Sequence, residues 1–516
     1  MRRRDFITAV AASAGSAYAA MKALDLLEQP AAAQPKPPFG LQRRGGRKKV
    51  VILGAGLAGM TCAYELRKVG YDCVILEARD RSGGRCWTLR GGDKFTDTNG
   101  QTETARFDKG LYFNPVPARI PQHHVTLDYC RELGVELEVF TNINRQQYYY
   151  NENVGALSGQ KIRAREAITD MRGYISELLA KAVNQDALNA NLSGTDKEKL
   201  VEFLRTYGGL NPDLFYTGSS RRGYAVPQGA ADSPGTLADP YDLSALINLG
   251  FAGYEASEWD YDQQMTMLQP LGGMDRIAKA MERRVKPLIT LGAEVQEIRK
   301  TPNGVRIVYI DKKNGQTQQV SGDYCICTIP LSVLRTIPSD FAPDMQAAIA
   351  SVDYAITGKS GLQFNRRFWE EDEDIYGGIT STNQPITQVW YPSSGYLSKK
   401  GVMLGYYNFG SNATNVGNLP PAQRLTLALE QGSKIHPQYR SHFENGISLF
   451  WPTIPYNLGG WASYTTTVRE QYYPRLNEPD GNIYLAGEHL SYLTGWMAGA
   501  FESARLVTSK INALPT

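Results

Sequence analysis

The clearest pattern of apolar and polar residues begins at residue 50. Residues 50–53 read Val-Val-Ile-Leu, an unbroken apolar run typical of a buried parallel strand. Residues 73–79, CVILEAR, predict a second strand, and the stretch between the two strands predicts a helix. Strand, helix and strand in this order predict a parallel βαβ unit.

Helical and strand patterns alternate through the rest of the chain. Apolar residues recur at three- and four-residue intervals between residues 159 and 207, which predicts helices. The Gly, Pro, Asp and Ser of residues 210–242 predict a long loop. A helix start is expected at 271–275, and a short strand followed by a terminal helix is expected from residue 482. Three further strands are predicted at residues 292–300, 304–311 and 323–330.

The spacing of glycines predicts what the first unit binds. Gly54, Gly56 and Gly59 form a G-x-G-x-x-G turn, whose glycines permit the tight turn, the approach of a pyrophosphate and close helix–strand packing. The helix N-terminus offers free N–H groups and a positive dipole end to the phosphates. Glu77 ends the second strand, where its carboxylate can accept both ribose hydroxyls and disfavours a 2′-phosphate. The residues predicted to form this cradle are Gly54, Ala55, Gly56, Leu57, Ala58, Gly59 and Glu77.

Length and composition are those of a globular enzyme. The 516 residues exceed what one hydrophobic core supports, so at least two domains are expected. The 42% hydrophobic and 21% charged fractions are typical of a soluble protein. A net charge of only +3 gives no basic field for nucleic acid, and no apolar run reaches the roughly 18 residues of a membrane span. The six cysteines show no metal-ligand spacing, so no metal site is predicted.

The N-terminus has the pattern of an export signal. Residues 3–7, Arg-Arg-Asp-Phe-Ile, match the twin-arginine motif, and Ala31 and Ala33 offer a cleavage site. A merely basic N-terminus is the alternative. Residues 1–33 are therefore predicted to be a signal peptide read by the twin-arginine export machinery, and residues 34–47 a linker. The folded protein would reach the periplasm or the medium, without a stable membrane anchor.

Two segments resemble those of a known family. Arg79 is followed at residues 82–85 by Ser-Gly-Gly-Arg, in which Gly84 lets Arg85 reach back to a pyrophosphate. Gly-Glu-His at residues 487–489 is followed by GWMAGA. Both resemble FAD-binding segments of the flavin amine oxidase family.

The resemblance implies an α/β fold. A Rossmann-like FAD-binding domain with a parallel sheet would be built from discontinuous segments, beside an α+β substrate-binding domain with a mixed sheet and a helical subdomain. The expected boundaries are 48–100, 262–335 and 455–516 for the FAD-binding domain, 101–160 and 336–454 for the substrate-binding domain, and 161–261 for the helical subdomain.

The same resemblance assigns further cofactor contacts. The monoamine oxidases carry a flavin-linked cysteine where this chain has Gly460, so FAD is expected to be held non-covalently. Cys86 is a poor substitute, because it lies at the pyrophosphate end. The additional residues implied to bind FAD are Ala78, Arg79, Gly84, Arg85, Val295, Glu488, Trp496 and Met497.

Three segments are implied to hold the substrate. Trp461 and Trp496, the latter next to Gly495, resemble the walls of the family's substrate cage, although core packing is the commoner fate of an indole. Residues 119–124, Arg-Ile-Pro-Gln-His-His, resemble the R-[LI]-P-x-x-H stretch of L-amino acid oxidases, whose arginine receives the substrate carboxylate. An arginine fork suits that role, but a surface arginine before a helix would look the same. Tyr391 is expected to share the carboxylate, although the register could equally favour its neighbour Trp390.

Lys359 is the remaining catalytic candidate. It lies in TGKSGLQF, where the family keeps a lysine on a water beside the hydride-accepting flavin nitrogen. A solvated lysine is the alternative. No catalytic role is predicted for His124.

These features together predict an FAD-dependent L-amino acid oxidase. Such an enzyme converts an L-amino acid and dioxygen into a 2-oxo acid, ammonia and hydrogen peroxide. The alternatives are an oxidase of amines, polyamines or cyclic amines, in which Arg119 is only structural, an oxidative decarboxylase, and a flavoprotein without turnover. Residues 254–262 mix acids and aromatics. If two of the acids face the pocket, the substrate could carry a basic side chain. The alternative is that this segment is a solvated charged turn. A homodimer is also left open.

Overall fold

The computed structural model describes residues 39–43, 48–187 and 192–515. The chain divides into two units, Met1–Arg43 and Arg44–Thr516. The predicted twin-arginine motif and cleavage site lie outside the described residues.

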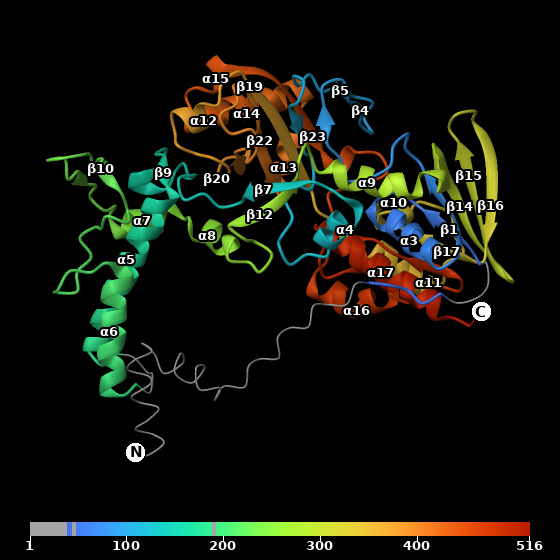
Figure 1. Cartoon of the computed structure of the whole chain (residues 1–516), viewed down its shortest axis with the longest axis horizontal. Coiled ribbons are helices and arrows are strands. Elements are labelled where there is room, and N and C mark those ends of the chain that lie inside the picture. Colours follow the sequence, from blue (N-terminus) through green and yellow to red (C-terminus); the bar gives the residue numbers. More distant parts are fainter. Residues whose placement is uncertain (1–38, 44–47, 188–191, 516) are drawn as a thin grey trace. The chain divides into compact units, whose positions relative to one another are not determined.

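A five-stranded parallel sheet carries the predicted βαβ unit (Figure 1). All four strand pairings are parallel. The apolar residues of the first strand are fully buried, which explains why its sequence does not alternate. In spatial order the strands are β13 (Ile289–Leu291), β2 (Asp72–Glu77), β1 (Lys49–Leu53), β17 (Tyr324–Cys327) and β25 (Ile483–Leu485).

A helix and a second sheet pack on this sheet, and the apolar residues of its central strand β1 are fully buried. Helix α3 (Leu57–Lys68) contacts β1 and β2 and packs against α17 (Met497–Ala513) (Figure 1). An antiparallel sheet contacts β1, β2 and β17. Its strands are β14 (Ala293–Thr301), β15 (Gly304–Asp311) and β16 (Gln316–Gly322).

A seven-stranded mixed sheet forms the second large element. Its neighbouring strands are antiparallel except for β20 and β8, which are parallel. Strand β19 lies between β23 and β22 and is buried along its whole length. In order the strands are β23 (Phe443–Phe450), β19 (Thr357–Phe364), β22 (Gly401–Phe409), β21 (Gln388–Trp390), β20 (Ile379–Thr382), β8 (Tyr148–Tyr150) and β9 (Ile162–Arg163).

The predicted helical region is present, with one difference. Helices α5 (Ala164–Asn184) and α6 (Gly194–Gly208) pack together, and α7 (Leu243–Leu249) and α8 (Ala252–Glu258) follow. The predicted loop at 210–242 contains a small hairpin, β10 (Tyr224–Val226) and β11 (Thr236–Leu237). These two strands are short and largely exposed, so they have no buried face that would produce an alternating pattern.

Four short 3₁₀ helices (Gly155–Leu157, Lys286–Leu288, Trp451–Thr453 and Glu488–Leu490) and the remaining α-helices and short strands complete the described chain. The helices are α4 (Thr126–Leu133), α9 (Asp275–Val285), α10 (Leu331–Leu334), α11 (Pro343–Ala350), α12 (Phe368–Glu371), α13 (Gly410–Gly417), α14 (Pro421–Ile435), α15 (Tyr439–His442) and α16 (Thr466–Leu476). The strands are β3 (Leu89–Arg90), β4 (Lys94–Thr96), β5 (Thr102–Thr104), β6 (Tyr112–Phe113), β7 (Leu137–Thr141), β12 (Thr266–Pro270), β18 (Asp353–Tyr354) and β24 (Ala462–Ser463).

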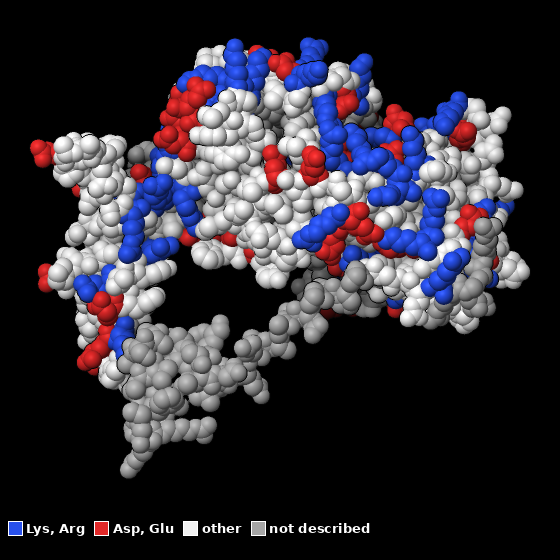
Figure 2. All heavy atoms as spheres, viewed as in Figure 1, with Lys and Arg blue, Asp and Glu red and all other residues white. Residues whose placement is uncertain are grey.

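The α/β fold class is confirmed by this architecture of a parallel sheet beside a mixed sheet. Within the described chain, every helix is too short or too polar to cross a bilayer. On the face drawn in Figure 2, lysines and arginines lie among aspartates and glutamates.

Candidate functional site

A large cavity opens at the carboxyl ends of the parallel strands. It measures about 1460 Å³ when counted out to its open mouth. Gly54, Glu77, Thr328 and Gly487, which follow or end β1, β2, β17 and β25, all line it. Ligands of open α/β sheets bind at this edge. All the residues predicted to bind FAD line the cavity except Ala55 and Gly59.

The three glycines of the turn have different surroundings. A Cβ added to Gly56 would meet no atom within 4 Å and would stand in open space. A Cβ on Gly59 would lie 2.0 Å from the carbonyl oxygen of Gly54, so only glycine allows this helix to pack so closely on the strand. Gly54 itself has φ of +102°, which favours glycine. Of these three glycines, Gly56 is therefore the one that lines the cavity with open space where a side chain would stand.

The Glu77 carboxylate is held by backbone N–H groups. Ala55 donates to Oε2 at 2.8 Å and Arg79 donates to Oε1 at 2.9 Å. The carboxylate is buried and lines the cavity. Because each oxygen has a second lone pair, Glu77 can still accept two hydroxyl groups.

Two helix N-termini point their unsatisfied N–H groups at the same cavity. Helices α3 and α17 both lack a side-chain cap, and their first residues, Leu57 and Met497, line the cavity. The two N-termini attract negative charge, α3 at the glycine turn and α17 beside Trp496. A dinucleotide with a pyrophosphate and an electron-poor ring fits this arrangement.

Arg85 links the βαβ unit to the C-terminal segment. Its Nη1 donates to Glu488 Oε1 and to the Gly460 carbonyl, both at 2.8 Å. Burial opposes its charge, but Glu488 and Tyr354 together outweigh burial and raise the pKa of Arg85. Arg79 donates to the Pro455 carbonyl at 2.6 Å. Both arginines line the cavity, where they could contact a phosphate or the edge of a flavin.

A second cavity adjoins the first. It measures about 1210 Å³ and is bounded on one side by the mixed sheet, through residues of β19, β20, β21 and β22. Six residues line both cavities, so the two cavities share a wall. They are Val116, Pro117, Trp461, Gly495, Trp496 and Met497. The predicted cage residues therefore lie where a substrate in the second cavity would meet a cofactor in the first.

Arg119 has unused donors in the second cavity. Its Nη2 donates to Gln263 Oε1 at 3.0 Å, but the buried Nε and Nη1 have no partner among the described residues. The guanidinium lies 4.4 Å from the centre of the Trp390 ring. Burial lowers the pKa of Arg119 to about 10, so the group remains charged at neutral pH. A buried, charged fork with open donors is a site for an anion.

Lys359 lies on β19 and lines the second cavity. Its Nζ donates to the Val116 carbonyl at 2.8 Å and lies 4.1 Å from the centre of the Tyr407 ring. Burial, together with the nearby Arg119 charge, lowers the pKa of Lys359 well below its usual value. Lys359 is therefore a buried amine beside the shared wall and not a solvated charge.

Tyr391 lies elsewhere than expected. Its hydroxyl bonds to Thr380 Oγ1 at 2.8 Å and to His436 Nε2 at 2.7 Å, within an apolar core on the other side of the sheet. The neighbouring Trp390 lines the second cavity instead. The two aromatics face opposite sides because side chains alternate along a strand. Gln388 and Trp390 face the cavity, whereas Val389 and Tyr391 face the core. The period of two shows from the sequence only that the two aromatics face opposite sides, and packing of the sheet decides which side is the cavity.

Several cavity residues were not predicted from the sequence. Tyr407 and Phe409 line the second cavity from β22, and Gln263 holds Arg119. Glu258 and Asp260 line it as well, so two acids of the 254–262 segment do face the cavity. Glu258 accepts hydrogen bonds from Arg145 at 3.2 Å and Gln147 at 2.7 Å.

Comparisons with known proteins agree with this geometry. The family model described as flavin containing amine oxidoreductase matches residues 57–512. YobN of Bacillus subtilis, named provisionally as an L-amino-acid oxidase, is 27% identical over 499 residues, covering 92% of this chain and 97% of that protein. The L-amino-acid oxidase of Gloydius blomhoffii is 26% identical over 496 residues, covering 92% of this chain and 90% of that protein.

A solved structure of putrescine oxidase with bound putrescine has the same fold. Its TM-score is 0.61 at 17% sequence identity, with 91% of this chain and 100% of that chain covered. Because the family model spans most of the sequence, this chain belongs to the flavin-containing amine oxidoreductase family.

Proposed function

We propose that the protein is an FAD-dependent L-amino acid oxidase. The observation that carries the proposal is Arg119, whose buried Nε and Nη1 atoms lack partners among the described residues and whose cavity shares a wall with the dinucleotide cavity. A buried guanidinium with open donors is costly unless an anion occupies it. The carboxylate of an amino acid supplies that anion. The similarity to L-amino-acid oxidases over most of the chain supports the same substrate class.

The chain's own residues would bind and orient the substrate. Arg119 would hold the carboxylate by two charge-assisted hydrogen bonds, and Trp461 and Trp496 would bound the space between substrate and cofactor. When bound, FAD supplies the acceptor for the Cα hydride and passes the electrons to dioxygen. In balance, an L-amino acid, dioxygen and water give a 2-oxo acid, ammonia and hydrogen peroxide. Positioning is the protein's main contribution.

Product analysis separates this reaction from its alternatives. L-Amino acids and the amines that lack their carboxylate should be compared in an oxygen electrode, with peroxide, ammonia and carbon dioxide quantified. An oxidase of amino acids releases ammonia and peroxide in equal amounts, whereas an oxidative decarboxylase releases carbon dioxide. Faster turnover of the amines would favour an amine oxidase and contradict the proposal, as would the absence of any turnover.

We expect FAD to be released intact when the protein is denatured. Gly460 lines the cavity without a sulfur, and burial raises the pKa of the Cys86 thiol to about 12, so it is protonated and unreactive at neutral pH. Acid or heat denaturation followed by filtration should leave all the yellow colour in the filtrate. Flavin that stays with the precipitated chain would contradict non-covalent binding.

We expect a basic side chain to be favoured on the substrate. Glu258 and Asp260 line the second cavity, and Arg145, the basic partner of Glu258, does not. Asp260→Asn should lower kcat/KM for L-lysine and L-arginine relative to L-leucine by about tenfold, or about 1.4 kcal/mol. Glu255→Gln, on helix α8 shortly before Asp260 but outside the cavity lining, is the matched control. An unchanged ratio would assign Asp260 to a solvated turn.

The predictions for the rest of the chain remain proposals. Residues 1–33 would direct export through the twin-arginine machinery to the periplasm or the medium, which fractionation of cells expressing the full chain would test. The domain boundaries given above would be tested by limited proteolysis, since linkers between domains are cut first.

A further inference from the structure

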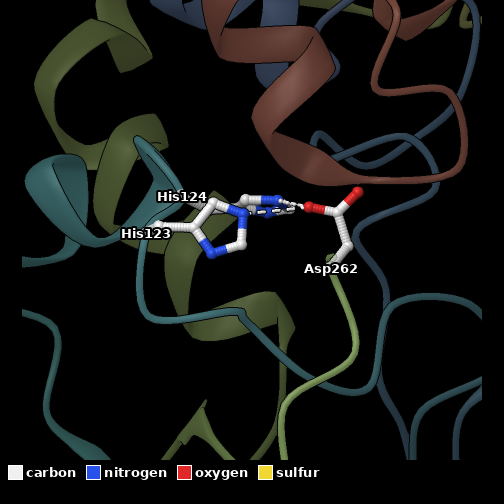
Figure 3. Close-up of side chains that lie close together, drawn as sticks. All are labelled: His123, His124 and Asp262. Atoms are coloured by element: carbon white, nitrogen blue, oxygen red, sulfur yellow. Dashed lines mark hydrogen bonds and ion pairs between the residues drawn. The ribbon is translucent and has the colours of Figure 1, made fainter. Parts of the chain in front are cut away.

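Three potential metal ligands converge next to the Arg119 segment. Figure 3 shows His123 and His124 directed at the carboxylate of Asp262. The Nε2 atoms of the two rings lie 3.0 and 2.8 Å from the same carboxylate oxygen, Oδ1. All three ligand atoms lie within 4.8 Å of one another. No other group of three such residues was found in the described part of the chain.

The cluster is built like a metal site that has one open side. In a tetrahedral zinc site with bonds of about 2.0–2.1 Å, neighbouring ligand atoms are about 3.3 Å apart. The two separations of 3.0 and 2.8 Å are close to that value. His124 is 3% exposed, whereas His123 is 29% and Asp262 24% exposed, so solvent can reach the open side.

We propose that His123, His124 and Asp262 bind a divalent transition metal ion of the Zn²⁺ class. Two imidazole nitrogens and one carboxylate oxygen suit such ions, whereas Mg²⁺ and Ca²⁺ prefer oxygen ligands alone. Without an ion, both rings bond to the same oxygen atom of Asp262. An ion would bond all three residues at once and complete its shell with water.

The proposed ion would hold together the two segments that position Arg119. The first segment runs from Arg119 to His124, and the second begins at Asp262 and Gln263, whose side-chain oxygen accepts from Arg119. Ile120 and Leu268 bond to each other through their backbones. His124 also packs edge-on against Trp496, with ring centres 5.1 Å apart. An ion at this point would therefore stiffen the substrate side of the cavity.

Zinc binding by the intact flavoprotein tests the proposal. The tag-free holoenzyme, freed of metal by a chelator and then desalted, is titrated with ZnCl₂ against a zinc-responsive dye. One ion per chain should bind, and a large excess of Mg²⁺ should not displace it. His123→Ala and Asp262→Asn should each weaken binding at least tenfold. His442→Ala is the matched control, because His442 bonds to Asn365 and lies outside the cluster.

Thermal stability gives a second readout that does not need activity. An ion that binds only the folded state raises the melting temperature. ZnCl₂ should therefore raise the melting temperature of the wild type and of His442→Ala, but not that of Asp262→Asn. The proposal is overturned if the wild type and His123→Ala bind zinc equally, or if His442→Ala removes the binding. An unfolded variant would be recognised by loss of its flavin. In that case the other of the two ligand variants, His123→Ala or Asp262→Asn, tests the proposal.

Discussion

Replacing Arg119 with alanine should lower kcat/KM for L-amino acids by about tenfold to a few hundredfold. The reason is the loss of a charge-assisted contact worth about 1.5–3 kcal/mol. The Nε and Nη1 atoms that would make this contact have no partner among the described residues, so no protein bond is expected to compensate. Initial rates on L-amino acids and on the matching amines measure the effect. The preference for L-amino acids over the matching amines should fall, because the amines lack the carboxylate that the Arg119 guanidinium would bind.

Two further variants make the Arg119 prediction specific. Arg119→Lys keeps the charge but not the fork, so it should restore only part of the activity. Arg131→Ala removes an arginine whose side chain is 71% exposed and should change nothing. If Arg119→Ala leaves the preference for amino acids over amines as it was, Arg119 is a structural residue, and the amine oxidase alternative gains support.

Lys359→Met should slow reoxidation by dioxygen by one to two orders of magnitude, or about 1.4–2.7 kcal/mol. The side chain keeps its length but loses an amine that lies beside the wall shared by the two cavities. A protonated Lys359 would stabilise the negative charge that dioxygen gains, and it has little to offer hydride transfer. Stopped-flow absorbance should show anaerobic reduction changed only a few-fold. Slow reduction with normal reoxidation would place Lys359 in substrate positioning instead.

The direction of the pH dependence follows from the lowered pKa of Lys359. Burial and the Arg119 charge make the ammonium form less stable, so it predominates only below this lowered pKa. Wild-type reoxidation should therefore slow as pH rises through that pKa, whereas Lys359→Met should lack this step. Lys434→Met, at an exposed lysine paired with Glu152, should keep the wild-type profile.

The sequence alone determined the features that depend on neighbouring residues. The βαβ unit was predictable because an unbroken apolar run, a glycine spacing and a terminal acid lie within forty residues of one another. The strand containing Lys359 and the helix starting near Trp496 were identified by local resemblance, and the structure has both. Such local patterns predict the structure correctly where the local preference of the chain agrees with its tertiary packing.

Only the tertiary structure decided which distant side chains share a space. Strand pairing turns Trp390 to the cavity and Tyr391 to the core, and a choice by resemblance alone selected the wrong side of the strand. Whether Glu258 faced solvent or the cavity depended on where helix α8 packs. The contact between His124 and Asp262 joins residues 138 positions apart, and no spacing rule covers that separation. Such pairs are set by the closure of long loops around a common core, which a one-dimensional pattern does not encode.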